Sequence, residues 1–406
     1  MNIFIKKAAA VLSFLLLIMP LFCFTQKAKA EVVTEYFTED ILASFTSAPA
    51  NGTVLDIKAK SVVLMEPHTG KVLYEANSRE RLAPASVTKI MSLLLVMEAI
   101  ENEKITLQTQ VTGSEHAASM GGSQIWLKVG EVMTVDELLR ASVIASANDA
   151  TVALAELVAG SEETFVEQMN ERAKELGMKN TTFVNACGLD AEGHLTTAMD
   201  VAIMSSALIK HELIKKYSTV WMDALRDGKS ELVNTNKLVR YYSGCTGLKT
   251  GTTSNAGCCV SATAQRDGME LVAVVMGGDN SNERFSGAKK LLDYGFANWS
   301  FASITADISD MGPIEILKGV EKTITPEAEG KVELLMKKGL QDKVERQIII
   351  DENITAPITA GDKIGSVKLM LEGEEVGEIP ITSANTVEKI SFFNSFVRML
   401  QAALCP

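Results

Sequence analysis

The sequence has little of what a metalloprotein or a disulfide-rich protein needs. Its 406 residues include four histidines and six cysteines, and no two cysteines have C-x-x-C spacing. Zinc sites depend on clustered ligands and disulfide frameworks on paired cysteines. We therefore expect no metal site, and we interpret the cysteines as small buried side chains. No organic cofactor is expected either.

Positive charge is also scarce. The 39 Lys and Arg residues against 51 Asp and Glu give a formal net charge of -12. This balance argues against a basic surface, so we expect no nucleic acid as a partner. With 47% hydrophobic and 22% charged residues, the composition also excludes a disordered or coiled-coil protein. The length allows two or three domains with a sizeable core.

The first thirty residues have the three-part layout of a secretory signal peptide. Lys6 and Lys7 precede an apolar run at 8–24, and A-K-A at 28–30 gives a small-x-small pattern. Residues 1–30 are therefore predicted to be a signal peptide. An uncleaved N-terminal membrane anchor is the alternative, because the apolar run is somewhat long. In both cases the bulk of the protein is exported.

Residues 55–298 are predicted to form one α+β domain. Two β-rich runs at 61–66 and 71–75 indicate a hairpin, and a second hairpin joins 257–264 to 270–276. Strands therefore lie at both ends of this region and helices between them, which is typical of an α+β unit.

Helix signals fill the middle of that region. A strongly apolar helix is predicted over 84–101. Thr134 and Glu137 have the spacing of a capping box, and Thr164 with Glu167 indicates that another helix begins there.

The C-terminal quarter has a different character. Short β-rich runs separated by turn residues predict a small all-β domain over 303–385. An amphipathic helix is predicted for 386–406, and its apolar side collects Val387, Ile390, Phe393, Val397, Leu400 and Leu404. Its charges argue against a membrane span, so we expect it to lie in the membrane interface. A helix packed back on the β domain is the alternative.

Ser86 and Lys89 are the first candidates for chemistry. They stand one helical turn apart at the start of the apolar helix, so their side chains project from the same face. A serine at a helix N-terminus feels the positive end of the backbone dipole, and a lysine in apolar surroundings can lose its proton near neutral pH. Together they predict an activated nucleophile that needs no histidine.

S-x-x-K alone is a weak signal, since Ser286 and Lys289 repeat it in another context. The ordered set is stronger: S-x-x-K is followed by Ser146-x-Asn148 and then by K-T-G at 249–251. The last triplet occurs once in the chain.

These ordered motifs resemble those of the penicillin-recognising serine acyl-transferases, which include β-lactamases and penicillin-binding proteins. A-P-A-S-V-T-K at 83–89 and T-G-L-K-T-G-T-T at 246–253 are most similar to low-molecular-mass D-alanyl-D-alanine carboxypeptidases. So are V-I-A-S-A-N-D-A at 143–150 and G-L-D at 188–190. The resemblance implies an antiparallel sheet flanked by helices, a small C-terminal β domain, a signal peptide and often a C-terminal amphipathic anchor. The expected location is the outer face of the bacterial cytoplasmic membrane or the cell wall.

The resemblance also implies the substrate and the first reaction steps. Ser86 attacks the penultimate D-Ala carbonyl of a peptidoglycan stem peptide that ends in D-Ala-D-Ala, and Lys89 accepts the serine proton. The terminal D-Ala leaves, and water then hydrolyses the acyl-enzyme. β-Lactam antibiotics are expected to acylate the same serine.

Further roles follow from the same resemblance. Ser146 relays a proton to the leaving nitrogen, and Asn148 holds the substrate backbone. Lys249 supplies positive charge, and Thr250 of the Lys249-Thr250-Gly251 triplet helps to recognise the terminal carboxylate. The backbone N–H groups of Ser86 and Thr252 hold the oxyanion. Some members of the family have histidine at the position of Thr252.

Three alternatives stay open. A β-lactamase with a glutamate-positioned water needs E-x-x-x-N between the second and third motifs, and none of the five asparagines there has a glutamate four positions earlier. An inactive cell-wall binding protein need not keep every reactive side chain, yet all are present. A DD-endopeptidase on the same scaffold would cut cross-links instead of stem-peptide ends. A Ser-His-Asp hydrolase is disfavoured, because no G-x-S-x-G occurs.

Overall fold

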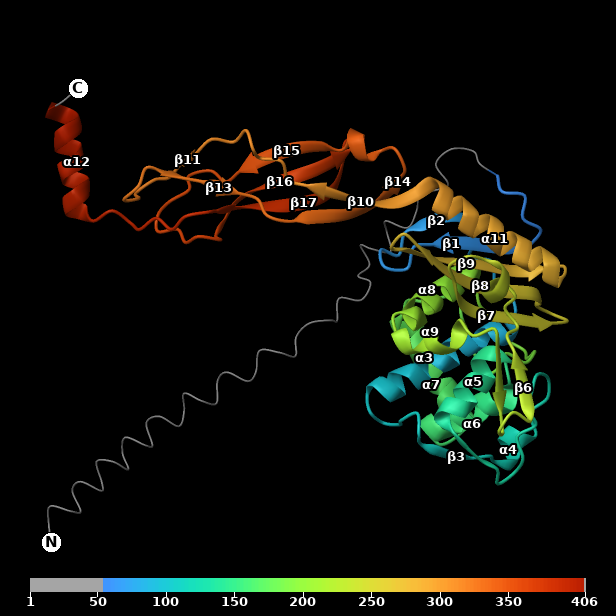
Figure 1. The fold of residues 1–406 in the computed structure, drawn as a ribbon. Coiled ribbons are helices and arrows are strands. Elements are labelled where there is room, and N and C mark those ends of the chain that lie inside the picture. Colours follow the sequence, from blue (N-terminus) through green and yellow to red (C-terminus); the bar gives the residue numbers. More distant parts are fainter. Residues whose placement is uncertain (1–53, 405–406) are drawn as a thin grey trace, which may run out of the picture.

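The computed structural model describes residues 54–404, with the side chains of 402–404 left out (Figure 1). The predicted signal peptide, 1–30, lies outside the described residues. The described chain forms a larger body of helices and one main sheet, from which an elongated β domain extends; the C-terminal helix lies at the far end of that domain (Figure 1).

A five-stranded antiparallel sheet forms the centre of the larger body, in the order β2-β1-β9-β8-β7. Its strands are β1 (Ser61–Met65), β2 (Val72–Ala76), β7 (Cys245–Thr253), β8 (Gly257–Arg266) and β9 (Met269–Gly278). Both predicted hairpins are present, and β1 pairs with β9 in the register Ser61 opposite Met276. This pairing joins the two ends of the α+β region, so the predicted fold class is confirmed.

Helices cover both faces of this sheet. One face packs against α11 (Ser281–Asn298), and the other packs against the helical layer that contains α8 (Figure 1). The helical layer consists of η1 (Ala85–Thr88), α3 (Lys89–Glu101), α4 (Glu115–Ala118), α5 (Val135–Ile144), α6 (Asn148–Ala159), α7 (Glu162–Glu175), α8 (Ala198–Ile209) and α9 (Glu212–Ser218). The short helix α10 (Leu238–Tyr241) contacts β7, and its Leu238 packs in the core on the α11 side of the sheet. Two short hairpins complete it: β3 (Gln110–Thr112) with β4 (Val132–Thr134), and β5 (Met222–Leu225) with β6 (Ser230–Val233).

Side-chain N-caps mark the starts of α4, α5, α7, α8 and α11, whereas α3, α6, α9 and α10 have none. The capping box is confirmed: the Thr134 hydroxyl accepts the Glu137 N–H at 3.2 Å, and the Glu137 carboxylate accepts the Thr134 N–H at 2.8 Å. The prediction that the next helix begins at Thr164 was wrong. Ser161 has the extended backbone of an N-cap and its hydroxyl accepts the Thr164 N–H, so α7 begins at Glu162.

The β domain follows α11 directly. Its strands are β10 (Trp299–Thr305), β11 (Ile314–Glu315), β12 (Thr323–Ile324), β13 (Pro326–Glu327), β14 (Lys331–Lys337), β15 (Glu345–Ile350), β16 (Lys363–Leu371) and β17 (Glu374–Ser383), with the short helix η2 (Gln341–Lys343) between β14 and β15. Its largest sheet has the order β13-β17-β16-β15. Strands β16 and β17 of this sheet pack with residues from the rest of the domain, such as Ile304 and Met336, in a core that is separate from the main body.

The terminal helix, α12 (Phe392–Leu404), begins later than predicted. Residues 386–391 are not helical, because Val387 exchanges two backbone hydrogen bonds with Ile358 and is buried in the core of the β domain. The large apolar side chains of α12 are uncovered: Phe392 is 88% exposed and Phe393 72%. Arg398 donates to the backbone of the β domain. Among the described helices, none is both long and apolar enough to cross a membrane.

Candidate active site

Lys89 and Ser86 meet where the short helix η1 passes into α3. Lys89 is fully buried, and its Nζ lies 3.0 Å from Ser86 Oγ. The same Nζ lies 2.6 Å from Asn148 Oδ1 and 2.8 Å from the Cys187 carbonyl oxygen. Burial lowers the pKa of Lys89 to about 8, against the smaller opposing effects of Cys187 and Asp149. The amine can therefore be neutral near physiological pH.

The turn that carries Ser86 is held by close backbone packing. Ala85 has a left-handed φ of 49°, a conformation that non-glycine residues rarely adopt. Gly188 packs directly against it, because a Cβ on Gly188 would lie 1.8 Å from the Ala85 carbonyl oxygen. The Thr88 hydroxyl also donates to that carbonyl at 2.8 Å. These contacts hold the backbone of the turn directly before Ser86.

Ser146 and Asn148 lie at the junction of α5 and α6. Ser146 is 4% exposed and has a left-handed φ of 63°. Asn148 uses both ends of its amide, since its Oδ1 accepts from Lys89 and its Nδ2 donates to the Gly121 carbonyl at 2.6 Å. In this structure the Asn148 side chain therefore orients Lys89, a contact that the sequence did not predict.

The K-T-G triplet lies on β7, at the edge of the main sheet. A Cβ on Gly251 would lie 2.8 Å from the Ser86 nitrogen and 2.9 Å from the Val87 nitrogen, so the strand and η1 touch backbone to backbone. Lys249 is 1% exposed, and its pKa is held well below the ordinary value by burial and by the charges of Lys89 and Arg284. Thr250 is buried, whereas Thr252 is exposed.

Arg284 is a charged site residue that the sequence analysis missed. It comes from the first turn of α11, and its guanidinium donates to the Gly251 carbonyl at 3.0 Å and to Thr252 Oγ1 at 2.9 Å. The residue is 8% exposed. No local motif marks it, because its contact with the end of β7 depends on how α11 packs across the sheet in which β8 separates β9 from β7.

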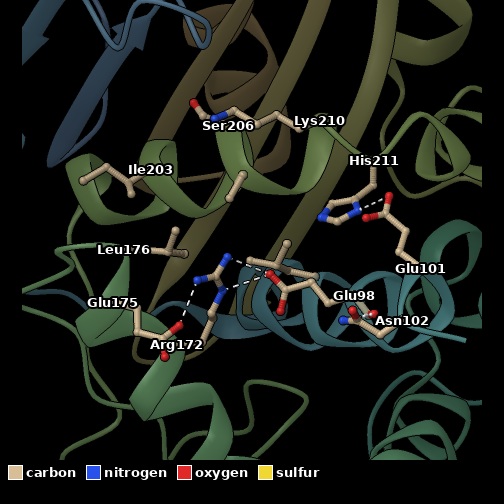
Figure 2. Close-up of a pocket in the computed structure, with 12 residues that line it drawn as sticks. Glu98, Glu101, Asn102, Arg172, Glu175, Leu176, Ile203, Ser206, Lys210 and His211 are labelled. Atoms are coloured by element: carbon tan, nitrogen blue, oxygen red, sulfur yellow. Dashed lines mark hydrogen bonds and ion pairs between the residues drawn. The ribbon is translucent and has the colours of Figure 1, made fainter. Parts of the chain in front are cut away.

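A separate cavity of about 520 Å³ lies between the C-terminal parts of α3, α7 and α8 (Figure 2). Arg172 joins Glu98 and Glu175 there, each at 2.8 Å, and His211 lies 2.7 Å from Glu101. None of the predicted site residues lines this cavity. Within residues 54–404, no three His, Cys, Asp or Glu side chains are grouped as metal ligands would be.

The fold, together with a serine held against a buried lysine amine, defines the class as the penicillin-recognising serine peptidases. The family model "D-alanyl-D-alanine carboxypeptidase" matches residues 27–280. The model "Penicillin-binding protein 5, C-terminal domain" matches residues 306–389. The chain therefore belongs to the D-alanyl-D-alanine carboxypeptidase family of serine peptidases.

Individual relatives agree with this assignment. The chain is 44% identical over 347 residues to the D-alanyl-D-alanine carboxypeptidase DacF of Bacillus subtilis, covering 84% of this chain and 89% of the relative. Its structure is similar to that of penicillin-binding protein 5 from Haemophilus influenzae, with a TM-score of 0.69, 31% identity, and coverage of 84% and 100%. The ampicillin-bound form of penicillin-binding protein D2 from Listeria monocytogenes matches with a TM-score of 0.55 and 31% identity, covering 60% of this chain and 100% of that one.

Proposed function

We propose that the protein removes the terminal D-alanine from peptidoglycan stem peptides that end in D-Ala-D-Ala, through an acyl-enzyme on Ser86. The observation that carries the proposal is the set of groups around the Lys89 amine. Asn148 Oδ1 and the Cys187 carbonyl can only accept hydrogen bonds, so they take both N–H groups of a neutral amine. The remaining lone pair is then free to accept the Ser86 hydroxyl proton at 3.0 Å.

The reaction follows from this arrangement. Ser86 Oγ forms a bond to the carbonyl carbon of the penultimate D-Ala while its proton passes to Lys89 Nζ. The C–N bond to the terminal D-Ala then breaks, and the proton returns to the leaving nitrogen, with Ser146 as the relay. Water hydrolyses the ester and regenerates Ser86. Burial and the neighbouring charges of Lys89 and Arg284 hold the pKa of Lys249 well below its ordinary value, so two positive charges side by side are disfavoured.

Two binding roles complete the proposal. The tight contact between Gly251 and η1 supports an oxyanion hole formed by the backbone N–H groups of Ser86 and Thr252. The terminal carboxylate of the substrate is assigned to Thr250 and Thr252, with Arg284 supplying the positive charge. β-Lactams would acylate Ser86 in the same geometry.

The test uses the purified chain and a pentapeptide that ends in D-Ala-D-Ala. We expect release of free D-Ala and covalent labelling by a fluorescent penicillin. Ser86→Ala should abolish both and leave the melting temperature unchanged. Retained labelling of Ser86→Ala would refute the assignment of the nucleophile. Cleavage of cross-linked muropeptides in preference to the pentapeptide would indicate an endopeptidase instead.

We also propose that the protein acts outside the cytoplasm and attaches to the membrane surface through α12. The exposure of Phe392, Phe393, Phe396 and Met399 supports insertion of this face into the lipid interface. Sedimentation with phosphatidylglycerol-containing vesicles tests it. Phe393→Ser should weaken binding and the neighbouring Asn394→Ser should not; equal binding of both variants would contradict the role of this face.

A further inference from the structure

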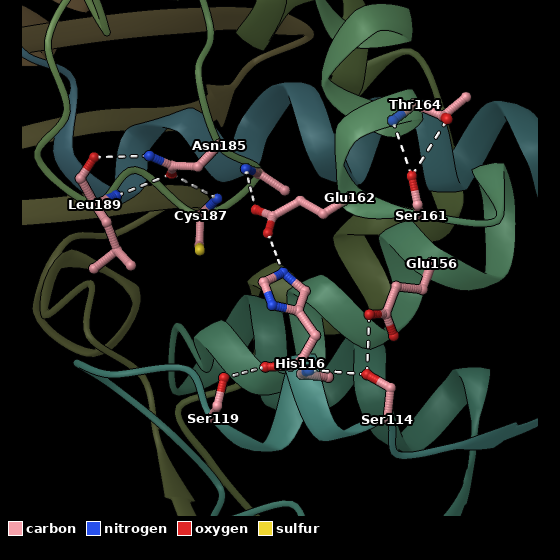
Figure 3. A network of polar contacts seen from close by, with 12 residues as sticks. Ser114, His116, Ser119, Glu156, Ser161, Glu162, Thr164, Asn185, Cys187 and Leu189 are labelled. Carbon is pink, nitrogen blue, oxygen red and sulfur yellow. Dashed lines mark hydrogen bonds and ion pairs between the residues drawn. The ribbon is translucent and has the colours of Figure 1, made fainter.

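The turn formed by residues 185–189 is a wall of the catalytic site, and it leads into the G-L-D motif at 188–190. Its Cys187 carbonyl accepts a hydrogen bond from the Lys89 amine at 2.8 Å. The Asn185 Oδ1 accepts the N–H groups of Cys187 and Leu189, at 3.3 and 3.1 Å (Figure 3). It also accepts the Gly188 N–H at 2.7 Å. The turn therefore has a fixed internal shape, and its position decides where the Cys187 carbonyl points.

Ala186 fixes that position, because its backbone is held from two sides. Ser92, one turn after Lys89 on α3, donates to the Ala186 carbonyl at 2.5 Å. Glu162, the first residue of α7, accepts the Ala186 N–H on Oε1 at 2.8 Å (Figure 3). Ala186, the residue before Cys187, is therefore held between α3 and the first residue of α7.

The other oxygen of Glu162 is also engaged. Its Oε2 lies 2.6 Å from His116 Nε2 on α4 (Figure 3). The Glu162 side chain is only 11% exposed, whereas that of His116 is 46% exposed. A largely buried carboxylate with both oxygens in contact has little freedom to move, so it defines the place of the Ala186 N–H.

We propose that Glu162 is a positioning residue for the carboxypeptidase reaction. Its Oε1 accepts the Ala186 N–H and so fixes the place of the 185–189 turn. The place of the turn determines where the Cys187 carbonyl lies. That carbonyl accepts a hydrogen bond from the Lys89 amine and orients it toward Ser86. The inference rests on the proposed function, because it assumes that Lys89 takes the Ser86 proton. Glu162 does not touch the substrate, and what it supplies is the position of a hydrogen-bond acceptor, not its charge.

Conservative variants separate position from charge. Glu162→Gln keeps the side-chain length and an oxygen acceptor while it removes the charge. Glu162→Asp keeps the charge and withdraws the acceptor by one methylene. Glu163 is the exposed neighbour on the same turn of α7, so Glu163→Asp is the matched control. The measurement is the time course of acylation by fluorescent penicillin, resolved into the dissociation constant of the initial complex and the acylation rate constant.

A misplacement of about 1 Å can cost about 10²-fold in rate, so Glu162→Asp should lower the acylation rate constant by about 10- to 100-fold. The dissociation constant should stay within about twofold, because the initial complex does not use the Lys89 proton transfer. Glu162→Gln should stay within about threefold of the wild type in both constants. Glu163→Asp should match the wild type.

Other patterns overturn the proposal. If Glu162→Asp acylates at the wild-type rate and Glu162→Gln acylates slowly, the charge of Glu162 matters and its position does not. If both variants acylate at the wild-type rate, the hydrogen bond from Ala186 to Glu162 is not needed. Equal loss of affinity and rate would indicate a general structural defect. If the melting curve shows that Glu162→Asp does not fold, Ser92→Ala is measured instead. This variant removes the hydrogen bond to the Ala186 carbonyl, which holds Ala186 from the other side. An unchanged acylation rate constant in Ser92→Ala would reject the proposal that the position of Ala186 matters. Failure of the wild type itself to acylate would instead refute the proposed function.

Discussion

The contact between Gly251 and η1 gives the sharpest test of how the site is assembled. Gly251→Ala adds one methyl group where the nearest atoms are the Ser86 nitrogen at 2.8 Å, the Ala85 Cβ at 2.9 Å and the Val87 nitrogen at 2.9 Å. Non-bonded heavy atoms prefer about 3.5–4.0 Å, so strand and turn must separate by about 0.7 Å or more. Gly251 does not have a left-handed φ, so the new residue brings no backbone strain of its own.

The magnitude follows from the same distances. Overpacking of a well-packed interior costs about 1–3 kcal/mol, and a domain of this size loses about 2–4 °C of melting temperature per kcal/mol. The rate suffers more than the stability. A displacement approaching 1 Å costs about 10²-fold, and loss of one oxyanion donor costs about 10²- to 10³-fold. We expect acylation of Gly251→Ala to fall by at least about 10²-fold in a protein that remains folded.

The assay is acylation by fluorescent penicillin together with a thermal melt. Gly312→Ala is the matched control, because a Cβ at Gly312 meets nothing within 4 Å. It should acylate and melt like the wild type. Wild-type acylation by Gly251→Ala would refute the argument that backbone contact between β7 and η1 sets the reacting geometry.

Three further predictions concern the base, the carboxylate and the fold. The acylation rate should rise with pH around a midpoint near 8, because protonated Lys89 cannot accept the Ser86 proton and its pKa in the folded protein is about 8; a flat profile of rate against pH would contradict a lysine base. Arg284→Gln should weaken D-Ala release from a peptide with a free terminal carboxylate by about 10-fold or more, as expected for loss of a charged hydrogen bond. Cleavage of the same peptide with an amidated C-terminus should be as fast in Arg284→Gln as in the wild type. Equal losses of cleavage rate on both peptides would rule out recognition of the carboxylate by Arg284. Thr134→Ala should lower the free energy of unfolding by about 1 kcal/mol in a denaturant titration without changing acylation, since it removes only the cap of α5; an unchanged unfolding midpoint would show that the capping box adds no stability.

Helix ends show where sequence patterns suffice and where they do not. The Thr134 capping box could be predicted, because its two hydrogen bonds join residues three apart in the chain. The starts of α7 and α12 were predicted incorrectly. For α7, more than one polar residue at 161–164 could serve as the N-cap, and the sequence does not show that Ser161 is the one used. For α12, Val387 fits the apolar pattern of the helix, but in the structure it pairs with Ile358 of the β domain instead.

The class of chemistry and the order of the motifs along the chain could be predicted without a structure. Ser86 and Lys89 could be paired because a three-residue spacing on a helix is a local geometric fact, and the K-T-G triplet at 249–251 could be recognised as a motif. The groups that surround the Lys89 amine could not be predicted, because they depend on how distant segments pack together. Every residue has a backbone carbonyl, so the sequence cannot show which one accepts from Lys89. No spacing pattern marks the Cys187 carbonyl, the Glu162 carboxylate or Arg284 as part of the site. Their roles arise because sheet order and helix packing bring together residues far apart in the chain, a long-range consequence of burying the whole core that no short pattern encodes.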